Sequence, residues 1–538
     1  MKSRTNPACG TCRKKCRKCD RARPVCNRCR AKGLHCEGYP PRFLFFQDQL
    51  NSKGHEQNNP VLSSSEPSPS SMTLCAQYTV STDDESLGQD TRPNSTTATN
   101  SQSRTTNSQK KRTSPSNLSQ RKPDNFSNAT TTSNGVIGPT KTLSTVTVDE
   151  ILPLSETEKL LSYFDKTLCR ALIIDTDDLH NPFRGYILPL AYQDIGILHA
   201  VLGLTMCHIT LSGKRETENA SVARMIEHQL SALQSLSSLL MKEEIYGLTD
   251  DEQDVLLAVV ILLVLYDICE TGVSSHGVHL TGAGYICGKL ARQPKVITSP
   301  RTTFLLTALG WLDVLRAFSG AEKLAYSDNV RRCILEADHF SLETLVGCPV
   351  ELFYEIGCVL TAGKQYMDGT LSVDAFRDLL DGAEQYFRIW DPQSIAFPSG
   401  NPEWIQLAEA YRHVCIIRVL RFPDTWAVPC EDERIQSSVR AILDASAEIS
   451  TDSAWFKRLL FPLFIAGTET SIPHQKRYIE FCMREIKRST GFPHPAMNEL
   501  LNRVWDERHR QADGPGNIPW MEYTCSRDLV RQHDYLMF

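Results

Sequence analysis

The sequence lacks both a secretory signal and a long apolar run. Its N-terminus reads MKSRTNPACG, without the apolar stretch that a signal needs. The longest unbroken apolar run, Val255 to Tyr266, has twelve residues, whereas a membrane-spanning helix needs about 20. We therefore expect no membrane partner. We also expect a reducing compartment, in which cysteines bind metal or remain thiols.

Alternating polar and apolar stretches, the pattern of β-strands, are scarce, and helical periodicity dominates from about residue 146 to 511. We therefore predict a large all-α domain with no short repeat. We place its helices near residues 190–211, 217–243, 251–270, 276–292, 302–318, 350–364, 373–388, 403–421, 432–448, 455–466, 472–489 and 495–509.

Two helices of this domain have distinctive sequences. Ser155-Glu156-Thr157-Glu158 has the pattern of a capping box and predicts the start of the first helix. Asp250–Asp254 followed by Val255–Tyr266 predicts a central helix that is apolar on every side, with acidic residues at its positive N-terminal end.

Large apolar residues are few between residues 47 and 145, where Ser, Thr, Asn, Gln and Pro predominate. Such a segment cannot bury enough surface to offset its ordering entropy, so we expect a disordered linker. The predicted organisation is a cysteine-rich head over residues 1–46, a linker over 47–145, a helical domain over 146–511 and a C-terminal tail over 512–538.

The charge is distributed unevenly. Residues 1–42 contain thirteen Lys or Arg and two Asp or Glu, whereas the rest of the chain is acidic and the total is −5. A compact basic head on an acidic body indicates a polyanionic partner for the head alone.

Seven of the nineteen cysteines lie within residues 9–36, and six of them form a repeated pattern. The spacing C-x2-C-x6-C occurs twice, seventeen residues apart, and uses Cys9, Cys12, Cys19, Cys26, Cys29 and Cys36. Structural zinc takes four ligands, so six thiolates complete two tetrahedra if two of them bridge the metals. The pattern therefore predicts a cluster of two zinc ions, whose binding supplies the folding free energy of a head with little apolar core.

The segment CGTCRKKCRKCDRARPVCNRCRAKGLHC resembles the fungal Zn2Cys6 binuclear-cluster DNA-binding domain. The resemblance implies that Cys9 and Cys26 are the bridging ligands and that a short helix follows each C-x-x-C. It also implies a turn at Pro24 between the halves, and Gly33 fits the end of the second helix. In that family the first helix enters the major groove and typically reads a CGG triplet.

Five of the six residues between Cys12 and Cys19 are basic: Arg13, Lys14, Lys15, Cys16, Arg17 and Lys18. On a helix they would spread over its exposed face, where Lys and Arg can bind guanine edges or phosphates. By the resemblance, the base-reading pair is Lys15 and Cys16. The family usually has Lys, Arg or His at the second place, so Cys16 shifts the expected readout to Lys15 or Arg17.

Cys16 allows three interpretations. It lies one helical turn after Cys12 and could replace a ligand, or its basic neighbours could lower its thiol pKa and make it redox-sensitive. The third interpretation is a small neutral residue at the DNA interface. We favour the third, because the repeat already assigns six ligands without Cys16.

The helical domain resembles the fungal-specific transcription factor domain. The resemblance rests on Asn181-Pro-Phe-Arg184, YILPLAYQDIGILHAVLGLTMCHI, WLDVLRAF near Trp311 and FPLFIAGTET at 461–470, and is closest to the subtype in arginine-catabolism regulators. It implies roles in regulation and dimerisation, and in some members the sensing of a small-molecule effector. No run of three heptads follows the cysteines, so monomeric binding and homodimer formation through the helical domain both remain open.

The sequence therefore predicts a nuclear transcription regulator that reads CGG-like triplets in double-stranded DNA and controls a metabolic or secondary-metabolite gene set. Lys110-Lys111-Arg112 and Arg121-Lys122 resemble a split nuclear import signal, although solvated charges in a linker explain them equally well. The alternative is an interaction or sensor protein whose zinc head binds a protein. We expect no enzyme: the Gly282-x-Gly284-x-x-x-Gly288 stretch lacks a preceding strand and fits helix packing better than a dinucleotide loop.

Overall fold

The computed structural model describes residues 11–12, 26–34, 36, 154–213, 219–274, 277–293, 299–337, 340–510, 517–524 and 534–535. The predicted linker over residues 47–145 lies outside the described residues. Helices build almost all of the described body, in agreement with the predicted all-α domain.

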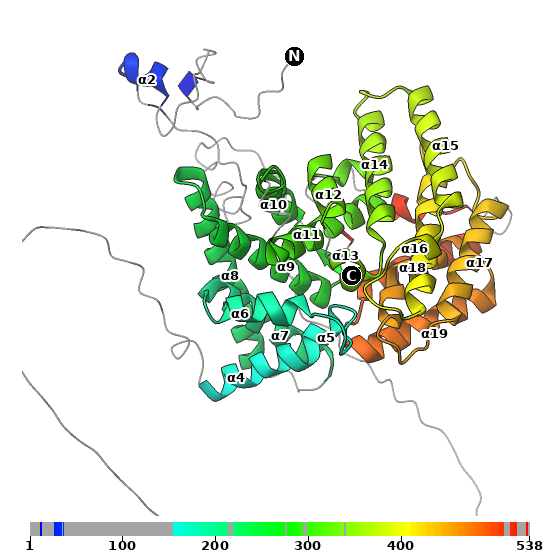
Figure 1. Cartoon of the computed structure of the whole chain (residues 1–538), viewed down its shortest axis with the longest axis horizontal. Coiled ribbons are helices and arrows are strands. Elements are labelled where there is room, and N and C mark those ends of the chain that lie inside the picture. The colour runs from blue at the N-terminus through cyan, green and yellow to red at the C-terminus, as the bar shows by residue number, and fades with distance from the viewer. Residues whose placement is uncertain are drawn as a thin grey trace, which may run out of the picture. The chain divides into compact units, whose positions relative to one another are not determined.

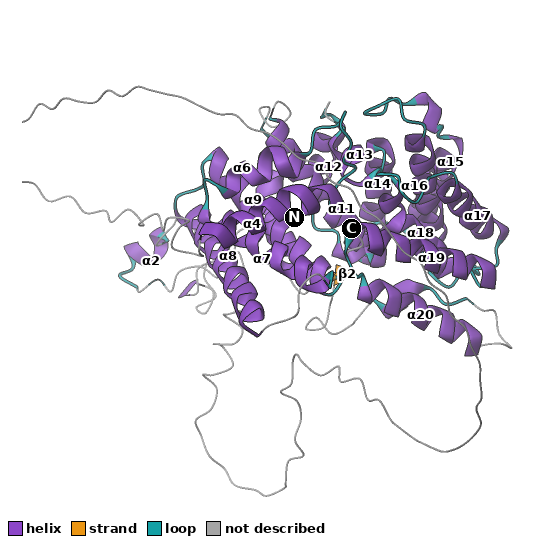
Figure 2. Cartoon of the chain, turned by 90° about the horizontal axis from the view of Figure 1, so that it is seen from below, coloured by secondary structure: helices purple, strands orange, loops and turns teal. Residues whose placement is uncertain are grey.

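The body has two groups of helices, which lie at opposite ends in both views (Figures 1 and 2). The N-terminal group contains α4 (Leu154–Tyr163), η2 (Phe164–Leu168), α5 (Cys169–Ala171), η3 (Phe183–Ile187), α6 (Leu188–Ala191), α7 (Ile195–Leu211), α8 (Asn219–Ile245), α9 (Asp250–Glu270) and α10 (Gly277–Leu290). The C-terminal group contains α14 (Val350–Met367), α15 (Val373–Ile389), η6 (Pro392–Ser394), α16 (Glu403–Leu420), α17 (Glu433–Ala447), η7 (Phe456–Leu459), α18 (Leu460–Glu469), α19 (Pro473–Thr490), α20 (Pro495–Arg510) and η8 (Trp520–Tyr523). Between the groups lie α11 (Pro300–Ser319), η5 (Ala321–Lys323), α12 (Asp328–Leu335) and α13 (Ser341–Val346).

The predicted central helix is confirmed as α9. Thr249 accepts a hydrogen bond from the Glu252 amide, and the Glu252 carboxylate accepts one from the Thr249 amide, so a capping box begins the helix. Every side chain from Leu256 to Tyr266 is buried. A helix that is apolar all round is stable only inside a protein, which explains the position of α9 in the core.

Helix α11 joins the two groups, because it packs against α9 on one side and against α13 and α14 on the other. Its Trp311 meets Phe461 of α18 and Tyr411 of α16 in edge-to-face contacts, with ring centroids 6.2 and 5.8 Å apart. Trp311 and Phe461 belong to two of the sequence stretches that resemble the fungal-specific domain. These stretches therefore build the core.

The predicted helix over residues 190–211 is wrong at its start. The chain forms η3 and α6, turns, and continues as α7 after a bend of 119°. The bend occurs because Asp194 is extended, and its carboxylate caps α7 by accepting from the Ile197 amide at 3.0 Å. This bent pair together has the length and composition of a membrane span, whereas no single described helix does.

The predicted start of the first helix also differs. Helix α4 already includes Leu154, so Ser155 lies inside the helix and is not its N-cap. Close packing is found at one glycine of the α10 stretch. A Cβ atom at Gly284 would lie 2.9 Å from the Tyr326 ring, whereas one at Gly288 would meet nothing within 4 Å.

Residues assigned to the C-terminal tail contribute to the core. Ile518, Trp520 and Met521 are buried, and the Trp520 ring packs edge-to-face against Phe464 of α18 with centroids 5.1 Å apart. Further on, β2 (Asp534–Tyr535) pairs antiparallel with β1 (Val273–Ser274), Val273 opposite Tyr535. The body thus extends beyond residue 511.

Candidate metal centre in the N-terminal head

The second cysteine triplet forms a short helix, α2 (Asn27–Ala31). Cys26 is its N-cap, with φ −66° and ψ 143°, and its sulfur accepts a hydrogen bond from the Cys29 amide at 3.3 Å. The same sulfur that faces the cluster therefore also satisfies an amide at the helix start. A C-x-x-C spacing produces this arrangement because the third residue after an N-cap presents its amide to the cap side chain.

The end of α2 is a Schellman motif at Gly33. Gly33 has φ +60°, its amide donates to Arg30 O at 3.2 Å, and the Leu34 amide donates to Cys29 O at 2.9 Å. The Leu34 side chain then packs against the buried cysteines. The prediction that Gly33 ends this helix is confirmed, and the motif returns the chain toward Cys36.

Three cysteine sulfurs converge in the head. Cys12, Cys26 and Cys29 are fully buried, and their sulfur atoms all lie within 4.8 Å of one another. The sulfur of Cys12 lies 3.8 Å from that of Cys26 and 3.9 Å from that of Cys29. These separations are far longer than the roughly 2.05 Å of a disulfide bond.

The donor set fits zinc. A Zn–S bond is about 2.3 Å long, so two sulfurs on one tetrahedral zinc lie about 3.8 Å apart. The two separations at Cys12 match this value. Thiolate sulfur is the preferred donor of structural zinc, and burial excludes water from the site, as a closed structural centre requires.

Arg28 adds positive charge beside the cluster. Its Nη1 atom donates to the Cys12 sulfur across 3.6 Å, and Arg28 lies between the two cysteines of the second C-x-x-C. Thiolates that bind a structural metal carry negative charge, so a guanidinium at this place lessens their mutual repulsion. Sequence analysis did not single out Arg28, although its place inside C-x-x-C is a usable signal.

The predicted ligands divide into those that the structure describes and those outside it. Cys12, Cys26 and Cys29 come together, and Cys36 is half-buried and packs against them. Cys9 and Cys19 lie outside the described residues. All six predicted DNA-contacting residues also lie outside them: Arg13, Lys14, Lys15, Cys16, Arg17 and Lys18.

In the body, polar residues of the resembling stretches contribute to the core. The Asn181 amide donates to Cys169 O at 2.8 Å and to Asp175 at 2.7 Å. Buried Glu469 forms an ion pair with buried Arg421, which also donates to the Asn517 side chain at 3.0 Å. The contacts of Arg421 join segments far apart in the chain, and the buried charges of Arg421 and Glu469 are paired with each other.

Head and body together define a two-part protein, with a cysteine-built metal site and a large helical domain. Residues 7–44 match the fungal Zn(2)-Cys(6) binuclear cluster domain, and residues 159–538 match the fungal specific transcription factor domain. The chain belongs to this family of fungal transcription factors. No curated protein and no solved structure matches the chain.

The match confirms the predicted class. The protein is a zinc-binding, DNA-binding transcription regulator and not an enzyme, and such a regulator acts in the nucleus. The matched head includes all six predicted zinc ligands and the whole basic segment between Cys12 and Cys19.

Proposed function

We propose that the head binds two zinc ions through Cys9, Cys12, Cys19, Cys26, Cys29 and Cys36, with Cys9 and Cys26 as bridges. The observation that carries the proposal is the meeting of the two triplets. The sulfur of Cys12 in the first triplet lies 3.8 Å from that of Cys26 and 3.9 Å from that of Cys29 in the second, the separation expected on a shared zinc. Six thiolates complete two tetrahedra only if two of them bridge, and the resemblance to the family assigns the bridges to Cys9 and Cys26.

On this cluster, the helix after Cys12 reads DNA through Lys15 or Arg17, while Arg13, Lys14 and Lys18 bind phosphates. The remaining residue, Cys16, is a neutral contact at the interface. The charge of this segment supports the proposal, because five cations in six residues are far more than zinc binding needs. Double-stranded DNA with CGG-like triplets is the proposed target, and a metabolic or secondary-metabolite gene set is the proposed regulated set.

Selection of binding sites from random oligonucleotides by the zinc-loaded full chain tests this function. We expect enrichment of a CGG-like triplet, lost when zinc is chelated. The competing function is a zinc head that binds a protein partner. It gains support if two zincs are bound but no DNA motif is enriched. Genome-wide mapping of bound sites then tests the regulated gene set.

We further propose that two copies pair through α8. Ile226, Leu230, Met241 and Ile245 are 46, 49, 60 and 63% exposed. At 100° per residue these four side chains lie within one 100° arc of the helix, which Gln234, Ser237 and Glu244 share. A second copy would cover this arc. Sedimentation of the full chain tests the pairing: Leu230→Glu should convert dimer to monomer, and a monomeric wild type would contradict it.

A further inference from the structure

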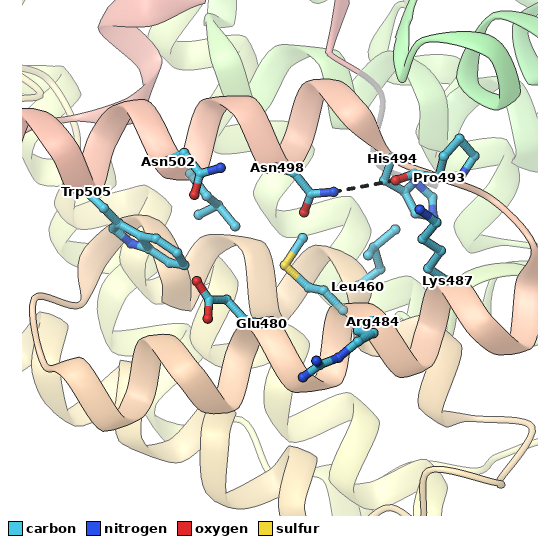
Figure 3. Close-up of a pocket in the computed structure, with 11 residues that line it drawn as sticks. Leu460, Glu480, Arg484, Lys487, Pro493, His494, Asn498, Asn502 and Trp505 are labelled. Carbon is cyan, nitrogen blue, oxygen red and sulfur yellow. Dashed lines mark hydrogen bonds between the residues drawn. The ribbon is translucent and has the colours of Figure 1, made fainter. Parts of the chain in front are cut away.

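A pocket of about 310 Å³ lies in the C-terminal group of helices, far along the chain from the zinc head (Figure 3). Side chains from α18, α19 and α20 line it, together with the turn between α19 and α20. Its volume lies within the range of small-molecule sites.

The floor of the pocket is apolar. Leu460, Met483, Leu501 and Trp505 are buried side chains that contribute to its wall. The Trp505 ring is held in place because its Nε1 atom donates to Gly467 O at 2.8 Å. A flat ring and three aliphatic side chains provide a surface for the apolar part of a ligand.

The rim of the pocket is polar and carries a net positive charge. Arg484 and Lys487 come from one face of α19, and Glu480 is the single acidic residue in the lining. Among the described residues, no carboxylate lies within ion-pair distance of Arg484 or Lys487. Asn498 and Asn502 of α20 add amide groups opposite these cations (Figure 3). The arrangement favours a ligand with one negative charge.

His494 supplies a second feature of a built site. The residue is 5% exposed, its ring lines the pocket, and no hydrogen-bond partner for the ring occurs among the described residues. Burial and, to a lesser degree, the charge of nearby Lys487 together lower the pKa of His494 to about 4, so the ring is neutral at physiological pH. The ring nitrogens are not sealed off from solvent, so a ligand in the pocket can replace water as their hydrogen-bond partner.

The backbone at His494 fixes this ring. Its φ is +46°, which non-glycine residues seldom adopt. Its carbonyl oxygen accepts a hydrogen bond from the backbone amide of Asn498 at 3.3 Å, in the first turn of α20. The ring also stacks near Phe492, with centroids 6.1 Å apart. Such strain is found where a side chain must keep one direction.

We propose that this pocket is an effector site for a small organic monocarboxylate with an apolar body. The carboxylate would bind Arg484 and Lys487, the imidazole of His494 would donate or accept one hydrogen bond, and the apolar body would rest on the floor beside Trp505. An organic cation would be repelled by the two basic side chains, and the polyanionic DNA backbone is too large for the cavity.

The test uses the zinc-loaded full chain and three probes: 4-phenylbutyrate, hexanoate and benzoate at millimolar concentration. Each is paired with the amine of the same skeleton: 4-phenylbutylamine, hexylamine and benzylamine. A ligand that binds only the folded state raises the unfolding midpoint. We expect at least one carboxylate to raise it and to change the tryptophan fluorescence, and no amine to do so. Absence of a shift with all three carboxylates, or equal shifts with the amines, would overturn the proposal.

Variants locate the binding. Arg484→Ala with Lys487→Ala should weaken carboxylate binding at least about tenfold, and Trp505→Phe should remove the fluorescence change. Arg477→Ala is the matched control, because Arg477 is exposed on the same helix and lies outside the lining.

His494→Asn removes the ring while keeping a residue type that tolerates positive φ, and should also weaken binding. Unchanged affinity in the double variant would refute the site. These readouts report ligand binding alone, so their failure would leave the proposed DNA contacts standing.

Discussion

The sulfur atom of Cys26 lies 3.8 Å from that of Cys12, although fourteen positions separate the two residues in the chain. The amide of Cys29 also donates to the Cys26 sulfur, so this one atom links a contact between the triplets with the start of α2. Helix formation and metal binding in the head therefore depend on each other.

Replacing Cys26 should for this reason do more than remove one ligand. We expect Cys26→Ala to lose both zincs and specific DNA binding, as we do for Cys9→Ala, because a bridging thiolate serves both metals. Metal analysis and DNA-binding assays of the full chain measure the two losses. Cys358→Ala, at a half-buried cysteine of the body, is the control and should keep both. A Cys26→Ala chain that retained two zincs and its DNA site would contradict the bridge.

The left-handed backbone of Gly33 predicts a graded effect of substitution. A Cβ atom at this position would meet nothing within 4 Å, so the cost of Gly33→Ala comes from φ +60° alone. We expect a loss of roughly 1–2 kcal/mol, which competition with a zinc chelator detects because metal binding and folding of the head are coupled. Gly33→Asn should lose less, since asparagine tolerates this region. An alanine variant as stable as the asparagine variant would show that the Schellman end is dispensable.

Lys15 is one of the two residues, with Arg17, that we expect to read a base. Lys15→Ala should weaken binding to the selected site by roughly 1–3 kcal/mol, with little effect on unrelated DNA. Affinity titrations with specific and random duplexes at fixed salt measure the difference. Equal weakening on both duplexes would instead assign Lys15 to a phosphate.

The buried pair of Arg421 and Glu469 predicts a large effect on the stability of the body. Arg421→Met leaves the Glu469 carboxylate buried without its main partner, and should destabilise folding by about 3–5 kcal/mol. Arg440 forms a pair with Glu433 on the surface, so Arg440→Met should cost less than about 1 kcal/mol. Chemical denaturation of the full chain measures both. Equal costs would mean that Arg508, 4.0 Å from Glu469, replaces the lost partner.

His228 predicts a dependence of stability on pH. Burial is the main cause that lowers the pKa of His228 to about 4. His199, whose ring nitrogen lies 2.7 Å away, and Arg224 contribute to the same shift. The unfolded chain keeps the ordinary value of 6.5 and so binds more protons between pH 6.5 and 4. The folded state therefore loses stability as pH falls through this window, by no more than roughly 3 kcal/mol.

The measurement compares wild type with His228→Gln, which should flatten this loss, and with His474→Gln at an exposed histidine, which should not. The stability curve of wild type alone is not sufficient, because burial raises the pKa of Glu343 to about 7 and this group stabilises the folded state more as pH falls. The difference between the curves of wild type and His228→Gln isolates the contribution of His228. Identical pH curves for wild type and His228→Gln would contradict the prediction.

Some features follow from the sequence because their causes are local. The repeated C-x2-C-x6-C spacing presents thiolates in two equivalent sets, and the residue after Lys32 must adopt a left-handed turn, which glycine permits. The apolar run before Tyr266 has no polar face, so α9 can exist only inside a core. These features depend only on residues that are close together in the chain. Their spacing and hydrophobic pattern therefore predicted the metal-binding head and the all-α body.

Tertiary structure decided what depends on residues far apart in the chain. The Asp194 turn within one apolar stretch, the pairing of Arg421 with Glu469 and the pocket around His494 have no pattern that a reader of the sequence would recognise. Each arises where packing brings helices together and a polar side chain must find a partner there. Periodicity shows which face of a helix is apolar, but the neighbour of that face is set by the packing of the whole body.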